Sequence, residues 1–178
     1  PGTGKSGIAV RLLAETLAAK RMAFFVAPNK AFRDAILGSL ARNDRSSRDR
    51  GEQLFKSSWS FHATTWRPGA SNEIETLIVD ESHRLKDKAY QYKGKSMVTD
   101  MVRAARIAVF FIDESQRVTW NDSGSVAAIK AAATQFGAEF HPPFSLAAQF
   151  RCNGSTGYLN WLDDVLQIRQ TGNFDNWG

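Results

Sequence analysis

The sequence predicts an α/β protein in three layers, with a parallel sheet covered by helices on both faces. Three observations lead to this prediction. Short apolar runs alternate with segments whose apolar residues recur at helical spacing. Two of these runs, "ETLIVDES" and "AVFFIDES", end in the same acidic letters. The chain also opens on "PGTGKS", most of a phosphate-binding loop, directly before a helical segment. Ligands of parallel sheets bind beyond the carboxyl ends of the strands, so the pattern favours an enzyme.

The first third of the chain alternates helix, strand and helix. Apolar residues at helical spacing predict a helix over 6–20. The run "MAFFVAP" is typical of a strand buried on both faces, and Pro28 ends it. Helical spacing resumes over 29–41, where Asn29 is a suitable N-cap. Residues 42–58 are expected to form a mobile, solvated loop, because "RNDRSSRDRGEQ" contains no apolar residue.

The remainder of the chain repeats this alternation. After the aromatic-rich and ambiguous "SWSFHATTW", the run "ETLIVDES" predicts a buried strand. A helix is expected from Ser96 to Ile107, and "AVFFIDES" is expected to form the next strand. A further helix in "SGSVAAIKAAATQFG" should stop at Gly137. The last expected elements are a short strand in "FSLAAQFR" and a helix in "STGYLNWLDDVLQI".

Composition restricts the class of protein. The 178 residues, 43% hydrophobic and 23% charged, suit one globular domain of ordinary size. No apolar run approaches the roughly 20 residues of a membrane span, so no membrane partner is expected. The single Cys152 excludes an internal disulfide and a multi-thiolate zinc site, and it favours the cytoplasm. The net charge of +5 and pI near 9.6 are compatible with nucleic-acid binding, although such a charge alone more often reflects solubility.

The opening letters predict a nucleotide site. In the pattern G-x-x-x-x-G-K-[ST], Gly4, Lys5 and Ser6 fill the last three positions. Backbone N–H groups of Gly2, Thr3 and Gly4 would form a nest for phosphates, assisted by the positive end of the following helix. Lys5 would reach the β- and γ-phosphates of ATP, and the Ser6 hydroxyl would bind Mg²⁺. The alternative is a chance glycine-rich turn that caps a helix.

The pattern's leading glycine and the strand before it would lie upstream of Pro1. We therefore expect residues 1–178 to be a single P-loop domain, cut inside its phosphate loop and lacking its first strand. Because that strand is normally central, its removal should expose backbone groups on two neighbouring strands. The isolated segment is then expected to be poorly stable, unless another chain or a rearrangement fills the gap.

The acidic letters predict the chemistry. An apolar strand that ends in Asp80 and Glu81 supplies two adjacent carboxylates. Asp80 would bind the metal, and Glu81 would polarise the attacking water. Gln116, three residues after Asp113, could bond the γ-phosphate or that water, unless it is a surface loop residue. Arg151 could neutralise charge that develops during phosphoryl transfer, unless it forms a structural ion pair.

Four stretches together carry a resemblance: PGTGKS, VDESHR, FFIDESQRVT and QFRCNGSTGYLNWLDDVL. In this order they resemble the helicase-like P-loop family called Schlafen group 3-like, over nearly the whole chain. More distantly, the set is similar to the first RecA-like motor domain of superfamily 1 helicases. That resemblance implies an ATPase acting on single-stranded DNA or RNA together with a second RecA-like domain, with Asp113, Gln116 and Arg151 at matching positions. "VAPNKAFR" and "SFHATT" are similar to segments that contact nucleic acid in such motors.

Two other functions fit the same residues. One is a nucleotide-dependent switch that reshapes a surface for a protein partner or fused effector domain. The other is an AAA-type ATPase, for which "PGTGKS" is also typical. That family usually carries a lone polar sensor after the next strand, so the spacing from Asp113 to Gln116 argues against it.

Several further residues are weaker candidates. Aromatic side chains could stack on bases, although core positions are the more frequent outcome: Trp59, Phe61, His62 and Trp66. Arginines diluted by acids more often form a solvated loop than a phosphate site: Arg42, Arg45, Arg48 and Arg50. His83 follows the acidic pair and could couple the ATP site to a nucleic-acid site. Cys152 has no recognisable base beside it and is expected to be an inert thiol.

Overall fold

The structure is a computed structural model in which these residues are described: 3–27, 30–41, 45–62, 71–87, 92–117, 119–146, 160 and 164–167. The chain divides into two compact units. The sheet unit comprises Ser6–Pro143, and the terminal unit comprises Pro1–Lys5 with Phe144–Gly178. Within the described residues, no helix is long and apolar enough to cross a membrane.

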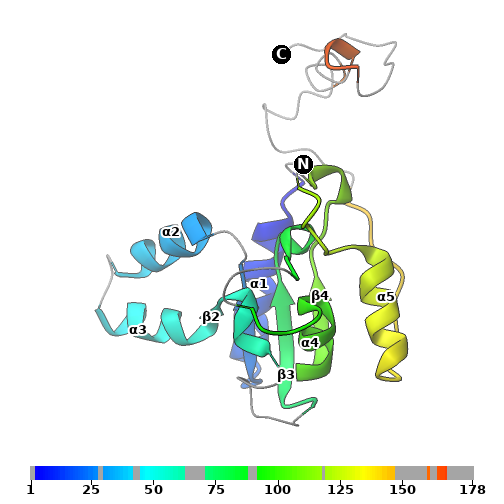
Figure 1. Ribbon diagram of the computed structural model, residues 1–178. Helices are drawn as coiled ribbons and strands as arrows, with labels where there is room; N and C mark the ends of the chain where they lie inside the picture. Colours follow the sequence, from blue (N-terminus) through cyan, green and yellow to red (C-terminus); the bar gives the residue numbers. More distant parts are fainter. Residues whose placement is uncertain are drawn as a thin grey trace. The chain divides into compact units, whose positions relative to one another are not determined.

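The sheet unit is built on four parallel strands (Figure 1). The order across the sheet is β2-β1-β3-β4. In chain order the strands are β1 (Ala23–Val26), β2 (Phe55–Lys56), β3 (Ile74–Val79) and β4 (Ala105–Phe110). β3 is buried on both faces, as a central parallel strand must be, and this explains its unbroken apolar sequence.

Helices cover both faces of this sheet, which confirms the predicted three layers. On one face α1 (Lys5–Ala18) packs Ala9 and Leu13 against Phe25 and Ile78. The other face carries η1 (Ser58–Phe61), α4 (Met97–Ala104) and α5 (Val126–Gln135), which pack on residues such as Leu77. Consecutive β3 residues therefore serve opposite cores, because side chains alternate across a strand.

Side-chain caps fix where the helices of the second face begin. The Ser96 hydroxyl accepts the Thr99 N–H at 3.4 Å at the start of α4, and Ser125 accepts the Ala128 N–H at 3.0 Å in α5. At its other end α5 stops before Gly137, whose φ of +62° is left-handed, as predicted. The expected helix over Ser96–Ile107 is shorter than predicted, because residues from Ala105 onward pair with β3 instead.

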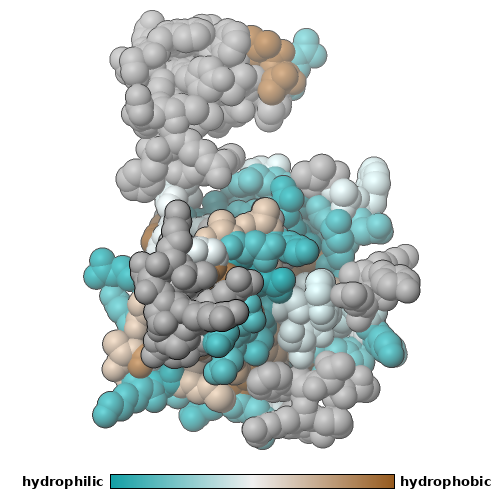
Figure 2. All heavy atoms as spheres, turned by 90° about the vertical axis from the view of Figure 1, so that its left-hand side faces the viewer, coloured by the Kyte–Doolittle hydropathy of each residue, from teal (hydrophilic) through white to brown (hydrophobic). Residues whose placement is uncertain are grey.

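The predicted loop over 42–58 is corrected by the structure. Residues Arg45–Leu54 form α3, β2 follows directly, and η1 begins at Ser58. α3 packs against α2 (Lys30–Ala41), and its last residue, Leu54, joins the core beside Phe55. Arg, Glu and Gln are good helix formers, so a polar segment can be helical when one end is anchored by packing. Figure 2 views the side on which α2 and α3 lie and shows hydrophilic and apolar residues interspersed there.

The described strands leave the expected gap in the sheet untested. β1, β3 and β4 are contiguous and hydrogen-bonded. Among the described strands β4 lies at one edge of the sheet, where Ile107 is 49% exposed. The predicted strand in "FSLAAQFR" and helix in "STGYLNWLDDVLQI" lie mostly outside the described residues.

Candidate functional site

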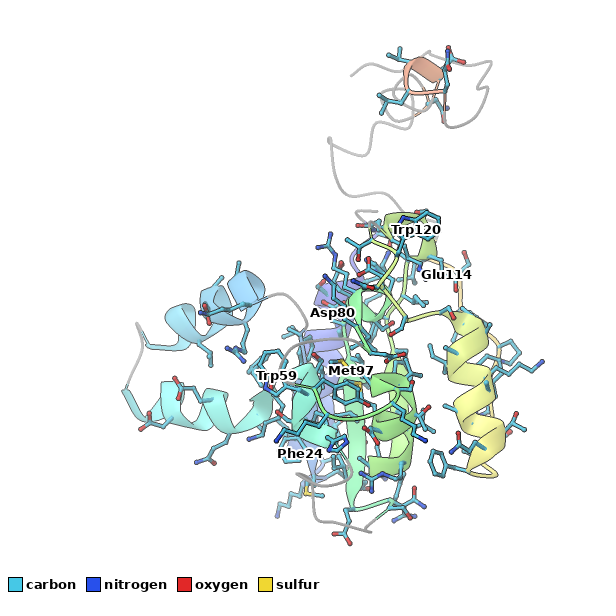
Figure 3. All side chains as sticks on the ribbon, in the orientation of Figure 1. Phe24, Trp59, Asp80, Met97, Glu114 and Trp120 are labelled. Carbon is cyan, nitrogen blue, oxygen red and sulfur yellow. The ribbon has the colours of Figure 1, made fainter. Side chains whose placement is uncertain are left out.

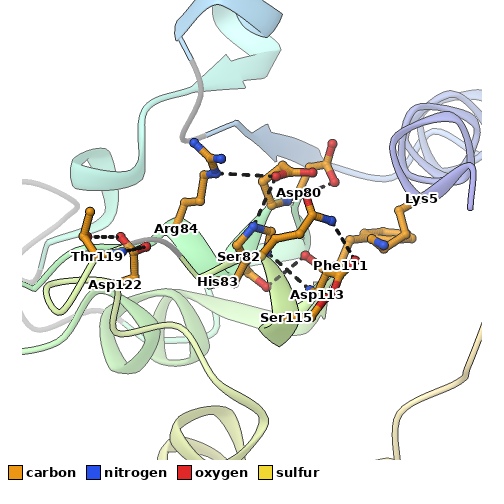
Figure 4. A network of polar contacts seen from close by, with 12 residues as sticks. Lys5, Asp80, Ser82, His83, Arg84, Phe111, Asp113, Ser115, Thr119 and Asp122 are labelled. Atoms are coloured by element: carbon orange, nitrogen blue, oxygen red, sulfur yellow. Dashed lines mark hydrogen bonds and ion pairs between the residues drawn. The ribbon is translucent and has the colours of Figure 1, made fainter. Parts of the chain in front are cut away.

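Two acidic segments meet at the carboxyl edge of the sheet, where β3 and β4 end side by side. The pairing of Val79 with Phe110 brings the two strand ends level. Beyond it, the Phe111 N–H donates to the Val79 carbonyl at 2.8 Å, and the Ser82 N–H donates to the Phe111 carbonyl at 2.9 Å. The Ser82 hydroxyl also donates to that carbonyl, at 2.9 Å. These bonds hold the segment after β3 against the segment after β4 (Figure 4).

Asp80 is a buried carboxylate at the end of β3. It is 1% exposed, and its backbone N–H continues the sheet by donating to the Val26 carbonyl at 2.9 Å. Its Oδ1 accepts the Glu81 N–H at 3.0 Å. Among the described residues, no cationic side chain forms an ion pair with it. A buried charge without such a partner is costly, so this carboxylate is suited to receive a cation.

Glu81 leaves the strand in an unusual backbone conformation. Its φ of +49° and ψ of +38° are left-handed, a region that residues other than glycine seldom occupy. Its carboxylate is 30% exposed and has two cationic or potentially cationic neighbours. Oε2 lies 3.3 Å from His83 Nε2 and 3.8 Å from Arg84 Nε. Strained backbone of this kind is concentrated at functional sites.

His83 connects the two acidic segments. The ring is fully buried, and its Nδ1 accepts the Asp113 backbone N–H at 3.3 Å. A neutral ring must then carry its proton on Nε2, the atom that faces Glu81. Burial lowers the pKa of His83, while the Glu81 carboxylate opposes this shift. Arg84 lowers this pKa further, and Asp113 and Asp122 raise it.

The lowered pKa makes the stability of the fold depend on pH. Below the ordinary histidine pKa of 6.5, His83 binds a proton in the unfolded chain more readily than in the folded chain. The free energy of unfolding therefore decreases as the pH falls below this value. We expect His83→Gln to reduce the difference between the urea midpoints measured at pH 7.5 and pH 5.5. His141→Gln is the control, because that ring is exposed near Glu139. An unchanged difference in His83→Gln would contradict the prediction.

The segment after β4 holds its polar groups in a local network. The Gln116 amide donates to Asp113 Oδ2 at 2.7 Å, and the Ser115 hydroxyl donates to Oδ1 at 2.6 Å. Glu114 serves a different purpose, because its Oε1 accepts the Val126 N–H at 2.8 Å and caps α5. Asp113 therefore fixes the position of Gln116, and Glu114 fixes the start of the helix that follows.

Sequence reasoning missed a second support of this edge, the turn at Thr119–Asp122. Asp122 is 3% exposed, and its carboxylate accepts both the hydroxyl and the N–H of Thr119, at 2.8 and 3.1 Å. Arg117 donates to the Asp122 carbonyl, and Lys86 pairs with Asp122 across an antiparallel bridge. A Thr followed three residues later by an acidic residue has the spacing of a capping box, so this local contact could have been predicted.

The turn is pinned to the segment that follows Glu81. The Ser123 N–H and hydroxyl both donate to the Leu85 carbonyl, at 2.7 and 3.0 Å. Gly124 is buried against Ser82, where a Cβ on the glycine would lie 1.8 Å from the Ser82 carbonyl oxygen. Only a residue without a side chain fits this contact.

Helix α1 begins at the same edge of the sheet. Residues 19–22 alone connect its end to the start of β1, and α1 packs along the strands, so its first turn within the sheet unit lies towards their carboxyl ends. Phe111, just beyond β4, packs with the same core as Ala9. The half-buried Ser6 is therefore on the side where Asp80 and Asp113 lie.

The phosphate-loop residues before Ser6 belong to the terminal unit. The Lys5 ammonium donates to the Thr3 hydroxyl at 3.4 Å. Gly4 has a φ of +79°, a conformation that suits glycine. Gly2 and Arg151 lie outside the described residues.

The weaker candidates separate by burial. Phe61 is fully buried in the core, the outcome expected to be the more frequent one for these aromatic residues. Trp59 is 43% exposed and His62 is half-buried. Trp66, Arg42 and Cys152 lie outside the described residues. The side chains of three further arginines are also not described: Arg45, Arg48 and Arg50. Among the described residues, no cluster of three or more His, Cys, Asp or Glu could hold a metal by itself.

A hollow of about 490 Å³ lies elsewhere in the sheet unit, between α2, α3 and β2. Its lining combines charged and apolar side chains: Arg33, Asp34, Leu37, Gly38, Glu52 and Phe55. None of the residues predicted from the motifs lines it.

Comparison with known proteins gives one family. The family described as Schlafen group 3, DNA/RNA helicase domain, matches residues 1–177. A search of curated proteins found no match. Among solved structures, the Hef helicase domain of Pyrococcus furiosus is 14% identical over 78% of this chain, with a TM-score of 0.44. This chain spans about a third (32%) of that chain's length.

The family match confirms the resemblance expected from the four motifs and gives the domain a helicase-like, nucleotide-binding class. It covers the acidic segments of both strands as well as the opening loop. The chain belongs to the Schlafen group 3 DNA/RNA helicase domain family.

Proposed function

We propose that residues 1–178 form one P-loop domain that binds and hydrolyses ATP with Mg²⁺ and acts on DNA or RNA. The observation that carries this proposal is the meeting of two acidic segments at one sheet edge. Asp80 and Glu81 leave β3 there, Asp113 and Gln116 leave β4 beside them, and α1 begins on the same side. Ligands of parallel α/β sheets bind at this edge.

Ser6 and Asp80 are the residues that would hold the metal ion. Asp80 fits this role because its carboxylate is buried without a described cation beside it. Mg²⁺ prefers oxygen ligands and, when bound, neutralises charge on the β- and γ-phosphates. Gly2, Thr3 and Gly4 would contribute backbone N–H groups to the phosphates, and Lys5 would contribute its ammonium group.

Glu81 is our candidate for the general base. Its carboxylate is partly exposed, so water can reach it, and it has neighbours on two sides that limit where it can point. A carboxylate in this place would orient the attacking water and draw its proton as the water attacks the γ-phosphate. Gln116, held by Asp113, would assist in orienting that water, and Arg151 would neutralise the developing charge.

His83 gives the proposed base a physical link to the second acidic segment. A shift of the Asp113 backbone would disturb the bond to Nδ1 and turn the ring whose Nε2 faces Glu81. Events at the loop after β4 can therefore alter the position of Glu81. This link supports a nucleotide site that responds to a second ligand, and the family description favours nucleic acid as that ligand.

A nucleic-acid-stimulated ATPase assay tests the proposal. We expect the full protein to hydrolyse ATP in a Mg²⁺-dependent manner and to do so faster with single-stranded DNA or RNA. Lys5→Ala should abolish ATP binding, measured with a fluorescent ATP analogue. Any ATP hydrolysis that remains in this variant measures the contaminating activity of the preparation. If neither nucleic acid changes the rate, the motor hypothesis fails and the nucleotide-dependent switch becomes the leading alternative. If Lys5→Ala binds ATP normally, the proposed phosphate site is wrong.

A further inference from the structure

We propose that a basic and aromatic surface beside α4 contacts single-stranded nucleic acid, with Trp59 stacking on a base and Lys93 and Lys95 binding phosphates. We name it the η1 surface and define it by its five residues: Lys56, Trp59, His62, Lys93 and Lys95. The inference rests on the proposed function in taking nucleic acid as the ligand, and it adds where that ligand binds. Trp59 belongs to η1 and is labelled in Figure 3.

Direct contacts join the two segments of this surface. The His62 and Tyr92 rings meet edge to face, with centroids 5.5 Å apart. Gly94 fits against both rings, since a Cβ there would lie 2.6 Å from His62 Cδ2 and 2.2 Å from the Tyr92 hydroxyl. The two exposed lysines that flank Gly94 are therefore held next to the segment that carries Trp59.

Hydrogen bonds connect this surface to α4. The buried Tyr92 hydroxyl donates to Asp100 Oδ2 of α4 at 2.7 Å. Arg103, one turn further along α4, donates to the Phe61 carbonyl at 3.3 Å, and Phe61 itself is fully buried. A surface that is already ordered loses little conformational entropy when it binds a ligand.

The charge of this surface favours an anion. Lys56, Lys93 and Lys95 are cationic, and the Lys56 ammonium lies 5.5 Å from the centre of the Phe24 ring. The carboxylates described nearby are already engaged. Asp100 bonds Tyr92 and lies 3.9 Å from Arg103, and Asp87 accepts the Met97 N–H at 2.8 Å.

The pairing of these cations with an exposed tryptophan favours nucleic acid over other anions. Trp59 is 43% exposed although it is a large apolar side chain. Proteins that bind single strands combine cations that follow the phosphates with aromatic rings on which bases stack. An acidic protein partner could also pair with the lysines, but it would have no nucleobases to stack on the Trp59 ring. Binding to oligonucleotides distinguishes the two partners.

Binding of the full protein to fluorescent dT₂₀ and rU₂₀ over a range of salt concentrations tests the inference. For Lys93→Ala with Lys95→Ala, we expect the slope of log K against log salt to fall in magnitude by about 1.4, since each phosphate contact contributes about 0.7 on single strands. Trp59→Ala should weaken binding by about 5- to 150-fold, the loss expected for one stacked base. Trp59→Phe should recover most of that loss, because a smaller ring still stacks.

The matched control removes two exposed lysines elsewhere in the sheet unit, Lys20→Ala with Lys130→Ala. It changes net charge equally and should leave the slope within about 0.3 of wild type, because these lysines lie on the α1–β1 turn and on α5. An equal fall in slope for both pairs would mean a general charge effect and would overturn the inference. Wild-type affinity for the oligonucleotides in both Trp59→Ala and the Lys93 and Lys95 variant would also overturn the inference. This is the result expected if the surface binds a protein.

Unstimulated ATP hydrolysis and ATP binding are measured in the same variants to distinguish this inference from the proposed function. Both should match wild type, since no residue of the η1 surface belongs to the proposed nucleotide site. Failure of the wild-type protein to hydrolyse ATP would remove the proposed function, whatever the oligonucleotides show. Hydrolysis of ATP without binding to either oligonucleotide would leave the nucleotide site standing and overturn the η1 surface.

Discussion

Glu81→Gln is expected to lower the rate of ATP hydrolysis by about 10²- to 10⁴-fold while ATP binding stays near wild type. The amide keeps the size and shape of the side chain but cannot accept a proton from the attacking water, and general bases contribute rate factors of this size. The neighbouring Asp80 is unchanged, so the proposed metal site should remain. Single-turnover hydrolysis with saturating ATP measures the chemical step, and equilibrium titration measures binding.

Glu114→Gln is the matched control at the other acidic strand. Its carboxylate accepts the Val126 N–H, and the amide oxygen of glutamine can accept the same bond. We therefore expect hydrolysis to change little and the melting temperature to change by no more than a few degrees. A Glu81→Gln protein that turns over at the wild-type rate would remove Glu81 from the role of base.

Gly124→Ala is expected to destabilise the fold and to reduce hydrolysis as well. The new Cβ would lie 1.8 Å from the Ser82 carbonyl oxygen and 2.7 Å from its carbon, so backbone must move. Overpacking of this kind costs about 1–3 kcal/mol and sometimes more. For a domain of this size, each kcal/mol corresponds to a melting temperature about 2–4 °C lower. Ser82 directly follows Glu81, so the displacement should also misplace the proposed base.

Gly38→Ala gives the opposite expectation and serves as the control. Gly38 lies inside α2, and a Cβ there would have no atom within 4 Å. Alanine in an open helical position should stabilise the chain by about 0.5–1 kcal/mol. Thermal melts followed by circular dichroism compare the two variants. A Gly124→Ala protein that melts at or above the wild-type temperature would contradict the close contact between Gly124 and Ser82.

The patterns in the sequence were sufficient for the layers of the fold. Unbroken apolar runs predicted β1, β3 and β4 as buried parallel strands, and helical spacing predicted α1, α2 and α5 close to their observed bounds. These features are local, because each strand that is buried on both faces has a continuous apolar sequence of its own. α3 failed for the same reason. Its sequence has no apolar face, and its packing against α2 lies outside the segment on which the loop prediction was based.

The candidate site divides in a similar way. The sequence was sufficient to find four residues of the site: Asp80, Glu81, Asp113 and Gln116. They follow apolar strands closely, and the residues that follow parallel strands lie at the carboxyl edge of the sheet. The order of strands was not predictable from any one segment. It decides that β3 and β4 are neighbours, and therefore that the two acidic segments touch.

The sequence by itself determined the alternation of strands and helices, the acidic residues at the strand ends and the family. Only the tertiary structure decided that His83 faces Glu81 with one nitrogen and bonds Asp113 with the other, and that Gly124 rests on Ser82. The His83–Asp113 and Gly124–Ser82 contacts join residues 30 and 42 positions apart, and a periodic pattern holds no information on which distant segments meet. Their pairing follows from the register of the sheet and from close packing, which are properties of the whole fold.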